Sequence, residues 1–310
     1  MLMAFEQWHG PRLDWRPVRS RDHASVRGAQ LPQQRLVVGS GRKGETLRER
    51  LGTGMVDTKN ALTEANGDLE KATEILRLKG AKGNAKRADR STSEGLVAAK
   101  EENGTATMIE LACETDFVAK GDKFVALAAK VLDAVSAAGA TSVDAGLAAA
   151  AGSQTVAELI ADEAAILGEK IELRRLAAFS GDKFSIYLHQ TSQDLPPQVG
   201  VVVAYTGDDA ETARAIAQHI SFADPVYLSR ADVPAEDIEK ERAIVTEISR
   251  NEGKPEAQLE KIVDGRISAY IKQIALLEQE YSRDNKFKVQ QVVDNAGLTI
   301  TGFARFKVGA

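Results

Sequence analysis

The stretch TLRERLGTGMVDTKNALTEANGDLEKATEILRLKGAKG, residues 46–83, shows a helical pattern of apolar residues that is interrupted twice by turn signals. Leu47 and Leu51 lie one turn apart, before a Gly-Thr-Gly break, and a second helical run starts at Met55. An Asn-Gly-Asp turn separates it from a third run. The pattern predicts three short helices in a domain near the lower size limit for independent folding.

Beyond these helices, the sequence alternates between strand-like and helical segments. Strand patterns occupy residues 105–114, 170–179, 183–190, 199–205 and 301–308. Helical patterns lie between them, at about 121–138, 153–167, 208–222 and 287–296. This order indicates an α+β fold with mostly antiparallel sheets rather than a regular βαβ series. Gly181-Asp182 predicts a hairpin between the second and third strands.

Two further segments stand out by composition. Residues 79–95 are rich in Gly, Lys and Ser without an apolar period, which predicts a solvated tether. Residues 233–284 are charged and helical, with a break at NEGKP (251–255). Because Gly ends one helix and Pro starts the next, this segment predicts an antiparallel helical hairpin inserted in the last sheet subdomain. Such a hairpin can form a homodimer or simply face solvent.

The first 44 residues differ from the rest. They hold eight Lys and Arg against three acidic residues, a net charge of +5 in a chain of net −5, which leaves −10 for the remainder. They also contain both tryptophans and show no helical or strand period. We expect an atypical, disordered leader; the alternative is an organellar transit peptide, although Asp14 and Asp22 interrupt its basic pattern.

The expected domain boundaries follow from these patterns. The leader spans 1–44, the three-helix domain 45–82 and the linker 83–95. The first core subdomain spans 96–180, and the second spans 181–310 with the hairpin at about 233–284.

Composition excludes several classes of protein. Cys113 is the single cysteine, which excludes an internal disulfide framework and favours a reducing compartment, so we expect the cytoplasm. No apolar run reaches the length of a membrane-spanning helix. The net charge of −5 provides no basic field, so we expect neither nucleic acid nor membrane as a partner.

The chain shows no catalytic or cofactor pattern. GSGRKGET (39–46) resembles a phosphate-binding loop, but Glu45 occupies the position of the essential lysine. His189 and His219 stand outside any metal-binding motif, and Cys113 lies mid-strand, where a buried and inert thiol is expected. We therefore expect no cofactor, no metal and no enzymatic activity. The basic residues of the tether could contact phosphates, but no aromatic side chain there could stack on a base.

ETDFVA (114–119) places an acid beside an aromatic residue at the end of a predicted strand. In one interpretation, Thr115 or Asp116 caps a following helix and Phe117 packs into the core. In the other, Phe117 stays exposed on a short turn and inserts into a pocket of a partner protein.

Several motifs in the same order resemble one family. They are LRERLGTGMVDTKNAL (47–62), NGDLEKA (66–72), TDFVAK (115–120), HISFADP (219–225), GKP (253–255) and TGFARFKV (301–308). Together they resemble bacterial elongation factor Ts, the guanine nucleotide exchange factor family of elongation factor Tu, over about residues 46–310. The resemblance implies a UBA-like three-helix domain, a core of two α+β subdomains and a helical hairpin in the second.

The resemblance also implies an activity and a set of site residues. The family binds the GDP form of elongation factor Tu and speeds GDP release without covalent chemistry. Asp116 and Phe117, flanked by Thr115 and Val118, match the pair that enters the GTPase domain near its Mg²⁺ and phosphate site. Arg48, Met55, Val56 and Lys59 match contacts to the same domain, and His189 matches a contact to another domain of the partner.

Two further expectations complete this interpretation. Some members of the family continue into a helix beyond the last strand, so exchange here should depend more on Phe117 and the three-helix domain. The rival function is a non-catalytic adaptor that binds RNA or a ubiquitin-like protein through the small helical domain and the basic linker.

Overall fold

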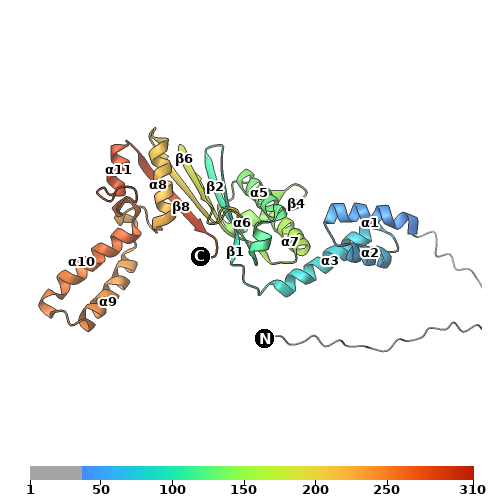
Figure 1. Cartoon of the computed structure of the whole chain (residues 1–310), viewed down its shortest axis with the longest axis horizontal. Coiled ribbons are helices and arrows are strands. Elements are labelled where there is room, and N and C mark those ends of the chain that lie inside the picture. The colour runs from blue at the N-terminus through green and yellow to red at the C-terminus, as the bar shows by residue number, and fades with distance from the viewer. Residues whose placement is uncertain (1–36) are drawn as a thin grey trace, which may run out of the picture.

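The computed structural model describes residues 37–310, with side chains from residue 41 onward, and its fold is α+β as the sequence predicts. Figure 1 shows three parts in a row: a three-helix domain at one end, two small sheets with their helices in the middle, and a helical hairpin at the other end. Each part has its own cluster of buried apolar side chains.

Helices α1 (Val37–Leu51), α2 (Met55–Glu64) and α3 (Leu69–Arg87) form the three-helix domain. Leu47, Leu62 and Leu76 meet in its core, and the Asp68 carboxylate caps α3 by accepting hydrogen bonds from two backbone amides. The prediction of a disordered leader to residue 44 is wrong from Val37 onward, because α1 begins there. The rest of that predicted leader lies outside the described residues.

The predicted tether over residues 79–95 is wrong in its first half, because α3 extends into it. Residues 79–87 are helical, so the irregular connection is restricted to residues 88–93. The helix persists because it packs on α7 (Val156–Leu167): Gly80 lies against Ala165, and Asn84 Nδ2 donates to the Ala161 carbonyl at 2.8 Å. Tertiary contact thus stabilises a helix whose glycines disfavour it locally.

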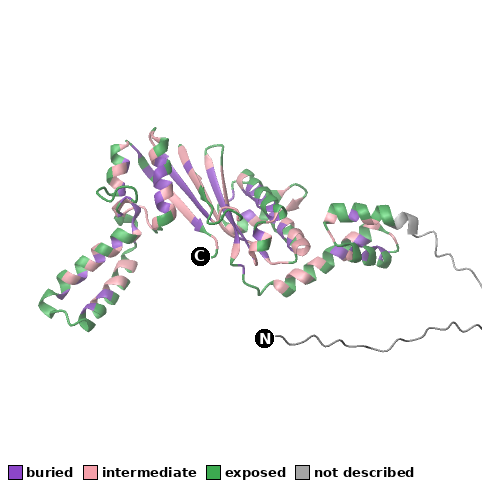
Figure 2. Ribbon diagram, viewed as in Figure 1, coloured by how far each residue is buried: buried purple, intermediate pink, exposed green. Residues whose placement is uncertain are grey.

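The first sheet is antiparallel, in the order β1-β2-β5: β1 (Glu94–Glu102), β2 (Thr105–Cys113) and β5 (Ile171–Ser180). Strand β1 was missed in the sequence because it is short of large apolar residues. Helices α5 (Asp122–Ala137), α6 (Val143–Ala148) and α7 enclose a core against this sheet. A two-residue pair, β3 (Ala150–Ala151) and β4 (Gln154–Thr155), precedes α7. All of β2 except its first residue is buried. In Figure 2 the buried residues of the middle part lie on the strands and on the helices beside them.

The second sheet has the order β6-β7-β8: β6 (Lys183–His189), β7 (Val199–Thr206) and β8 (Thr299–Lys307). Helices α8 (Ala210–Ala223) and α11 (Val289–Asn295) cover one face. The predicted hairpin at Gly181-Asp182 is wrong: β5 pairs with β2 and β6 pairs with β7, so this turn carries the chain from one sheet to the other.

The two sheets pack on each other through a small apolar cluster. Val97 and Met108 of the first sheet meet Val202 and Phe306 of the second. Glu110 of β2, fully buried, is paired with the guanidinium groups of Arg174 and Arg175 on β5, and Arg175 donates to the Lys307 carbonyl of β8. Apolar contact and the hydrogen bond from Arg175 to β8 therefore join the two sheets, while the ion pair of Glu110 links β2 and β5 within the first sheet.

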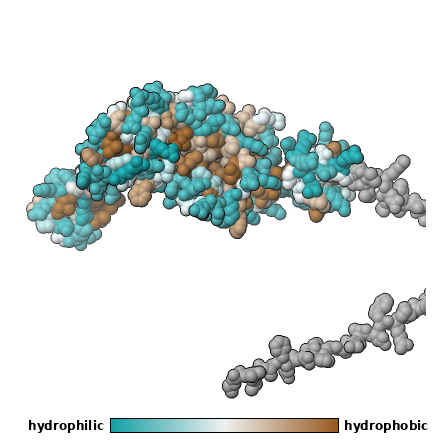
Figure 3. Space-filling model, turned by 45° about the horizontal axis from the view of Figure 1, so that its top comes forward, coloured by the Kyte–Doolittle hydropathy of each residue, from teal (hydrophilic) through white to brown (hydrophobic). Residues whose placement is uncertain are grey.

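The predicted helical hairpin is confirmed. Helices α9 (Ala235–Asn251) and α10 (Glu256–Ile274) are inserted between α8 and α11 and have their own apolar core. Short 3-10 turns, η1 (Arg230–Asp232) and η2 (Leu276–Glu278), flank the hairpin. In Figure 3 the hairpin carries apolar side chains among hydrophilic ones; Ile244 and Ile248 of α9 are exposed. Within residues 37–310, no helix is long and apolar enough to cross a bilayer.

Candidate functional site

Phe117 projects from a single helical turn, α4 (Asp116–Ala119), that follows the end of β2. Thr115 is extended and caps the turn: its hydroxyl accepts a hydrogen bond from the Val118 amide at 3.4 Å. Ala119 is fully buried, and Val118 packs against the core of the first sheet. Phe117 points away from this core and is 75% exposed. A large apolar ring is therefore exposed on a turn that Val118 and Ala119 pack against the core.

Charged groups flank the exposed ring. The Lys120 ammonium lies 4.5 Å from the centroid of the Phe117 ring and 3.5 Å from an Asp116 carboxylate oxygen. Exposed contacts of this kind contribute little stability, on the order of 0–1 kcal/mol. An acid, an aromatic ring and an ammonium group are therefore available together at the surface.

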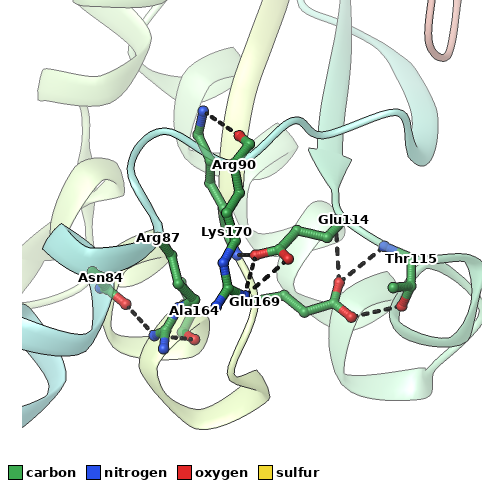
Figure 4. Close-up of polar contacts among 8 residues, drawn as sticks. All are labelled: Asn84, Arg87, Arg90, Glu114, Thr115, Ala164, Glu169 and Lys170. Carbon is green, nitrogen blue, oxygen red and sulfur yellow. Dashed lines mark hydrogen bonds and ion pairs between the residues drawn. The ribbon is translucent and has the colours of Figure 1, made fainter.

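The base of the turn is held by Glu169, which follows α7. The Glu169 carboxylate accepts hydrogen bonds from the amides of Glu114 and Thr115, both at 3.1 Å, and from the Thr115 hydroxyl at 2.6 Å (Figure 4). The Cys113 thiol donates to the Thr115 carbonyl at 3.3 Å. Burial, with Glu169 nearby, raises the pKa of Cys113 to about 12, as expected for an inert thiol.

The site residues expected in the three-helix domain lie on α1 and α2. Met55 and Val56, at the start of α2, are 66% and 70% exposed. Lys59, one turn later, and Arg48 on α1 are also exposed. Two adjacent exposed apolar side chains are typical of a surface that contacts another protein.

His189 is exposed at the end of β6, in the second sheet. Its Nδ1 shares a hydrogen bond of 3.0 Å with the Tyr187 hydroxyl, and the two rings are stacked. The structure thus brings Thr115 to Val118 together in one turn, while the residues of the three-helix domain and His189 lie on separate elements.

Sequence reasoning missed two residues of interest, Glu169 and Phe222. Phe222 is 84% exposed near the end of α8, although its motif HISFADP had been noted. The Arg305 guanidinium of β8 donates to the Ser221 carbonyl, just before Phe222, and pairs with Asp224. These contacts fix the end of α8. Glu169 follows Gly168, which ends α7 in a left-handed conformation, and nothing in the local sequence indicates which segment it faces.

His219 is buried, as expected from packing. Its Nε2 bonds to the Gln279 side-chain oxygen at 2.9 Å, and its Nδ1 accepts from the Ser282 amide at 3.2 Å. Burial, partly offset by the bond to Gln279, lowers the pKa of His219 below its ordinary value. In the part of the chain that the structure describes, no group of three or more His, Cys, Asp or Glu is arranged to hold a metal.

Several basic residues expected in a free tether are engaged within the protein. Lys79 pairs with Asp57 at 2.5 Å, Arg87 donates to the Ala164 carbonyl at 3.3 Å, and Arg90 pairs with Glu114 at 3.1 Å. A cation already paired contributes less to binding phosphates, which weakens the case for a nucleic-acid adaptor.

Comparison with known proteins identifies one family. The profile described as Elongation factor TS matches residues 114–310. The elongation factor Ts of Leifsonia xyli subsp. xyli is 74% identical over 267 residues, which cover 86% of this chain and 97% of the relative. That of Clavibacter sepedonicus is 70% identical, over 85% of this chain and 96% of the relative. That of Tropheryma whipplei is 55% identical, with the same coverage of 85% and 96%.

Proposed function

Because the chain belongs to the elongation factor Ts family and is a translation elongation factor, we propose that it binds elongation factor Tu in its GDP form and promotes GDP release, so that GTP can rebind. One observation carries the proposal: Phe117 is 75% exposed on a turn whose base is fixed by hydrogen bonds. An exposed aromatic ring on a rigid turn is suited to enter a pocket of a partner.

The Asp116-Phe117 turn enters the GTPase near its Mg²⁺ and phosphate site. GDP and Mg²⁺ are held there by charge-assisted bonds, so release requires a state of the GTPase that binds the exchange factor well and the nucleotide poorly. Each 1.4 kcal/mol of coupling weakens nucleotide affinity about tenfold. An aromatic anchor contributes about 2 kcal/mol or more, so one ring and a broad interface can supply the several kcal/mol required.

The chain acts by binding and makes or breaks no covalent bond. Its single thiol, Cys113, is buried with a raised pKa, and His219 is engaged in hydrogen bonds. Arg48, Met55, Val56 and Lys59 contact the same GTPase domain as Phe117, and His189 contacts another domain of the partner. Their exposure supports this assignment. The cytoplasm, where translation takes place, is the compartment proposed for the chain.

Stopped-flow release of a fluorescent GDP from elongation factor Tu tests the proposal. We expect the wild-type chain to accelerate release and Phe117→Ala to lose most of the acceleration, with unchanged circular dichroism, because the ring is 75% exposed and adds little to the protein's own core. Phe287→Ala removes another exposed ring, in the segment before α11, and serves as the matched control that retains activity. Equal rates for wild type and Phe117→Ala would refute the proposed role of the ring.

A further inference from the structure

Two glutamate carboxylates accept hydrogen bonds from backbone amides at the point where β2 and β5 separate. The last backbone pair of the two strands is Cys113 with Ile171. Just beyond it, the Glu169 carboxylate accepts from the amides of Glu114 and Thr115, and the Glu114 carboxylate accepts from the Lys170 amide at 2.6 Å. Side chains thus continue the pairing of the strands after the backbones have separated. We call this arrangement the glutamate clasp (Figure 4).

The clasp is also tied to the linker that leads from the three-helix domain. The Arg90 guanidinium binds both oxygens of Glu114, at 3.3 and 3.1 Å, and Lys170 Nζ donates to the Arg90 carbonyl at 3.1 Å. Burial alone would raise the pKa of Glu114, but the Lys170 amide and the Arg90 guanidinium outweigh it and hold that pKa below its ordinary value. Glu114 is therefore ionised at neutral pH and accepts these bonds as a carboxylate.

Glu169 contacts the start of the turn through Thr115. The Thr115 hydroxyl donates its proton to Glu169, which leaves a lone pair for the Val118 amide at the start of α4. The Thr115 amide is fixed by the same carboxylate. Without Glu169, the amides of Glu114 and Thr115 and the Thr115 hydroxyl lose their acceptor, next to the turn that carries Phe117. The Phe117 ring, 75% exposed, contributes little packing that could hold the turn in its place.

From this geometry we infer that Glu169 is a positioning residue for the Asp116-Phe117 turn: it holds Thr115 so that Phe117 is presented to the partner already ordered. The inference rests on the proposed function. If the turn is already ordered before binding, its conformational entropy is not lost when the complex forms, and binding is stronger by that amount. If the turn is ordered only a fraction of the time, the rate of the step that depends on Phe117 falls to that fraction of its full value.

The substitutions Glu169→Ala and Glu169→Gln separate positioning from a general loss of stability. Alanine removes all three hydrogen bonds. The glutamine oxygen can still accept from both amides, and its NH₂ can donate to the Thr115 hydroxyl, so this variant keeps the shape of the clasp. Glu172→Ala is the matched control: Glu172 is a partly buried carboxylate on β5, three positions further along the chain, that binds Thr92, Lys170 and Arg174 and makes no hydrogen bond to the turn.

The first measurement is the release rate of fluorescent GDP at increasing concentrations of the full chain. For Glu169→Ala we expect the maximal rate to fall about tenfold with little change in the half-saturating concentration, as for a turn ordered about a tenth of the time. Glu169→Gln and Glu172→Ala should stay within about twofold of wild type. Combining Glu169→Ala with Phe117→Ala should cost no more than Phe117→Ala alone, because both act through the same ring.

The second measurement needs no partner. Amide hydrogen exchange at Thr115 should accelerate at least about tenfold in Glu169→Ala, while Leu111 in the middle of β2 stays protected. A wild-type chain without effect on GDP release would overturn the proposed function. A Thr115 amide unaffected by Glu169→Ala, a wild-type release rate in that variant, or additive losses in the double variant would each overturn the positioning role.

Discussion

Phe117 and Phe124 lie seven positions apart and have opposite environments. Phe124 is fully buried in α5, whereas Phe117 is 75% exposed. Of the two interpretations of ETDFVA, the cap by Thr115 and the exposure of Phe117 both hold, and burial of Phe117 is wrong. Sequence left the choice open because a turn of four residues is too short for an apolar period to assign its faces.

His219 should make stability depend on pH. Its pKa is lowered in the folded state, so the unfolded chain binds more protons once the pH falls below the ordinary value of 6.5. The contribution of His219 is therefore complete above pH 6.5 and is lost as the pH falls toward the folded pKa. Protonation would place a second N–H against the Ser282 amide. Chemical denaturation at pH 7.5 and 5.5 should show a lower free energy of unfolding at the acidic pH.

His219→Gln provides the comparison for this effect. Glutamine can still bond to Gln279 but does not titrate, so the fall in stability between the two pH values should shrink. The variant His189→Gln, at an exposed histidine, should retain the wild-type fall. Identical pH dependence in wild type and His219→Gln would assign the effect to other groups.

The elements that sequence reasoning predicted well are those with a clear period. Helices α5, α7 and α8 and strands β2 and β7 lie within a few residues of their expected bounds. Strand β1 and the second half of α3 were missed, because alanine, lysine and glycine carry no period that reports their environment. β1 is formed by pairing with β2, and α3 is extended by packing on α7.

Gly200 of β7 allows the two sheets to approach. A Cβ at this position would collide with Val97 Cγ1 and lie 3.0 Å from Met108 Sδ, both in the first sheet. We expect Gly200→Ala to lower the free energy of unfolding by about 1–3 kcal/mol, the usual cost of overpacking. Gly302→Ala, on the neighbouring strand, meets only Phe179 at 3.8 Å and should be close to neutral. Urea denaturation checks both; equal stability of the two variants would contradict this account.

At the scale of the whole molecule, α3 sets the position of the three-helix domain relative to the core. It packs on α7, and the clasp holds the linker that follows it. The helical hairpin, at the other end of the molecule in Figure 1, contacts the core through its base, where Ala275 pairs with Tyr227. Formation of a homodimer through the hairpin stays a prediction.

Gly80→Leu should separate the three-helix domain from the core. A Cβ at Gly80 would lie 2.9 Å from the Ala165 Cβ, and a leucine side chain would force α3 away from α7. Small-angle X-ray scattering should show a larger radius of gyration than for wild type. Ala85→Leu, at an exposed position of the same helix, should leave the radius unchanged. An unchanged radius in Gly80→Leu would mean that the two helices do not hold the domains together.

Periodicity, caps and motifs are local properties, and they were enough to predict the α+β class, the helical hairpin, the family and the candidate residues Asp116 and Phe117. Three features could be seen only in the folded protein: β5 and β6 belong to different sheets, Phe117 faces outward and Thr115 bonds to Glu169. The difference arises from distance along the chain. Glu169 and Thr115 are 54 positions apart, and a hydrogen bond between such residues exists only once α5, α6 and α7 have folded between them.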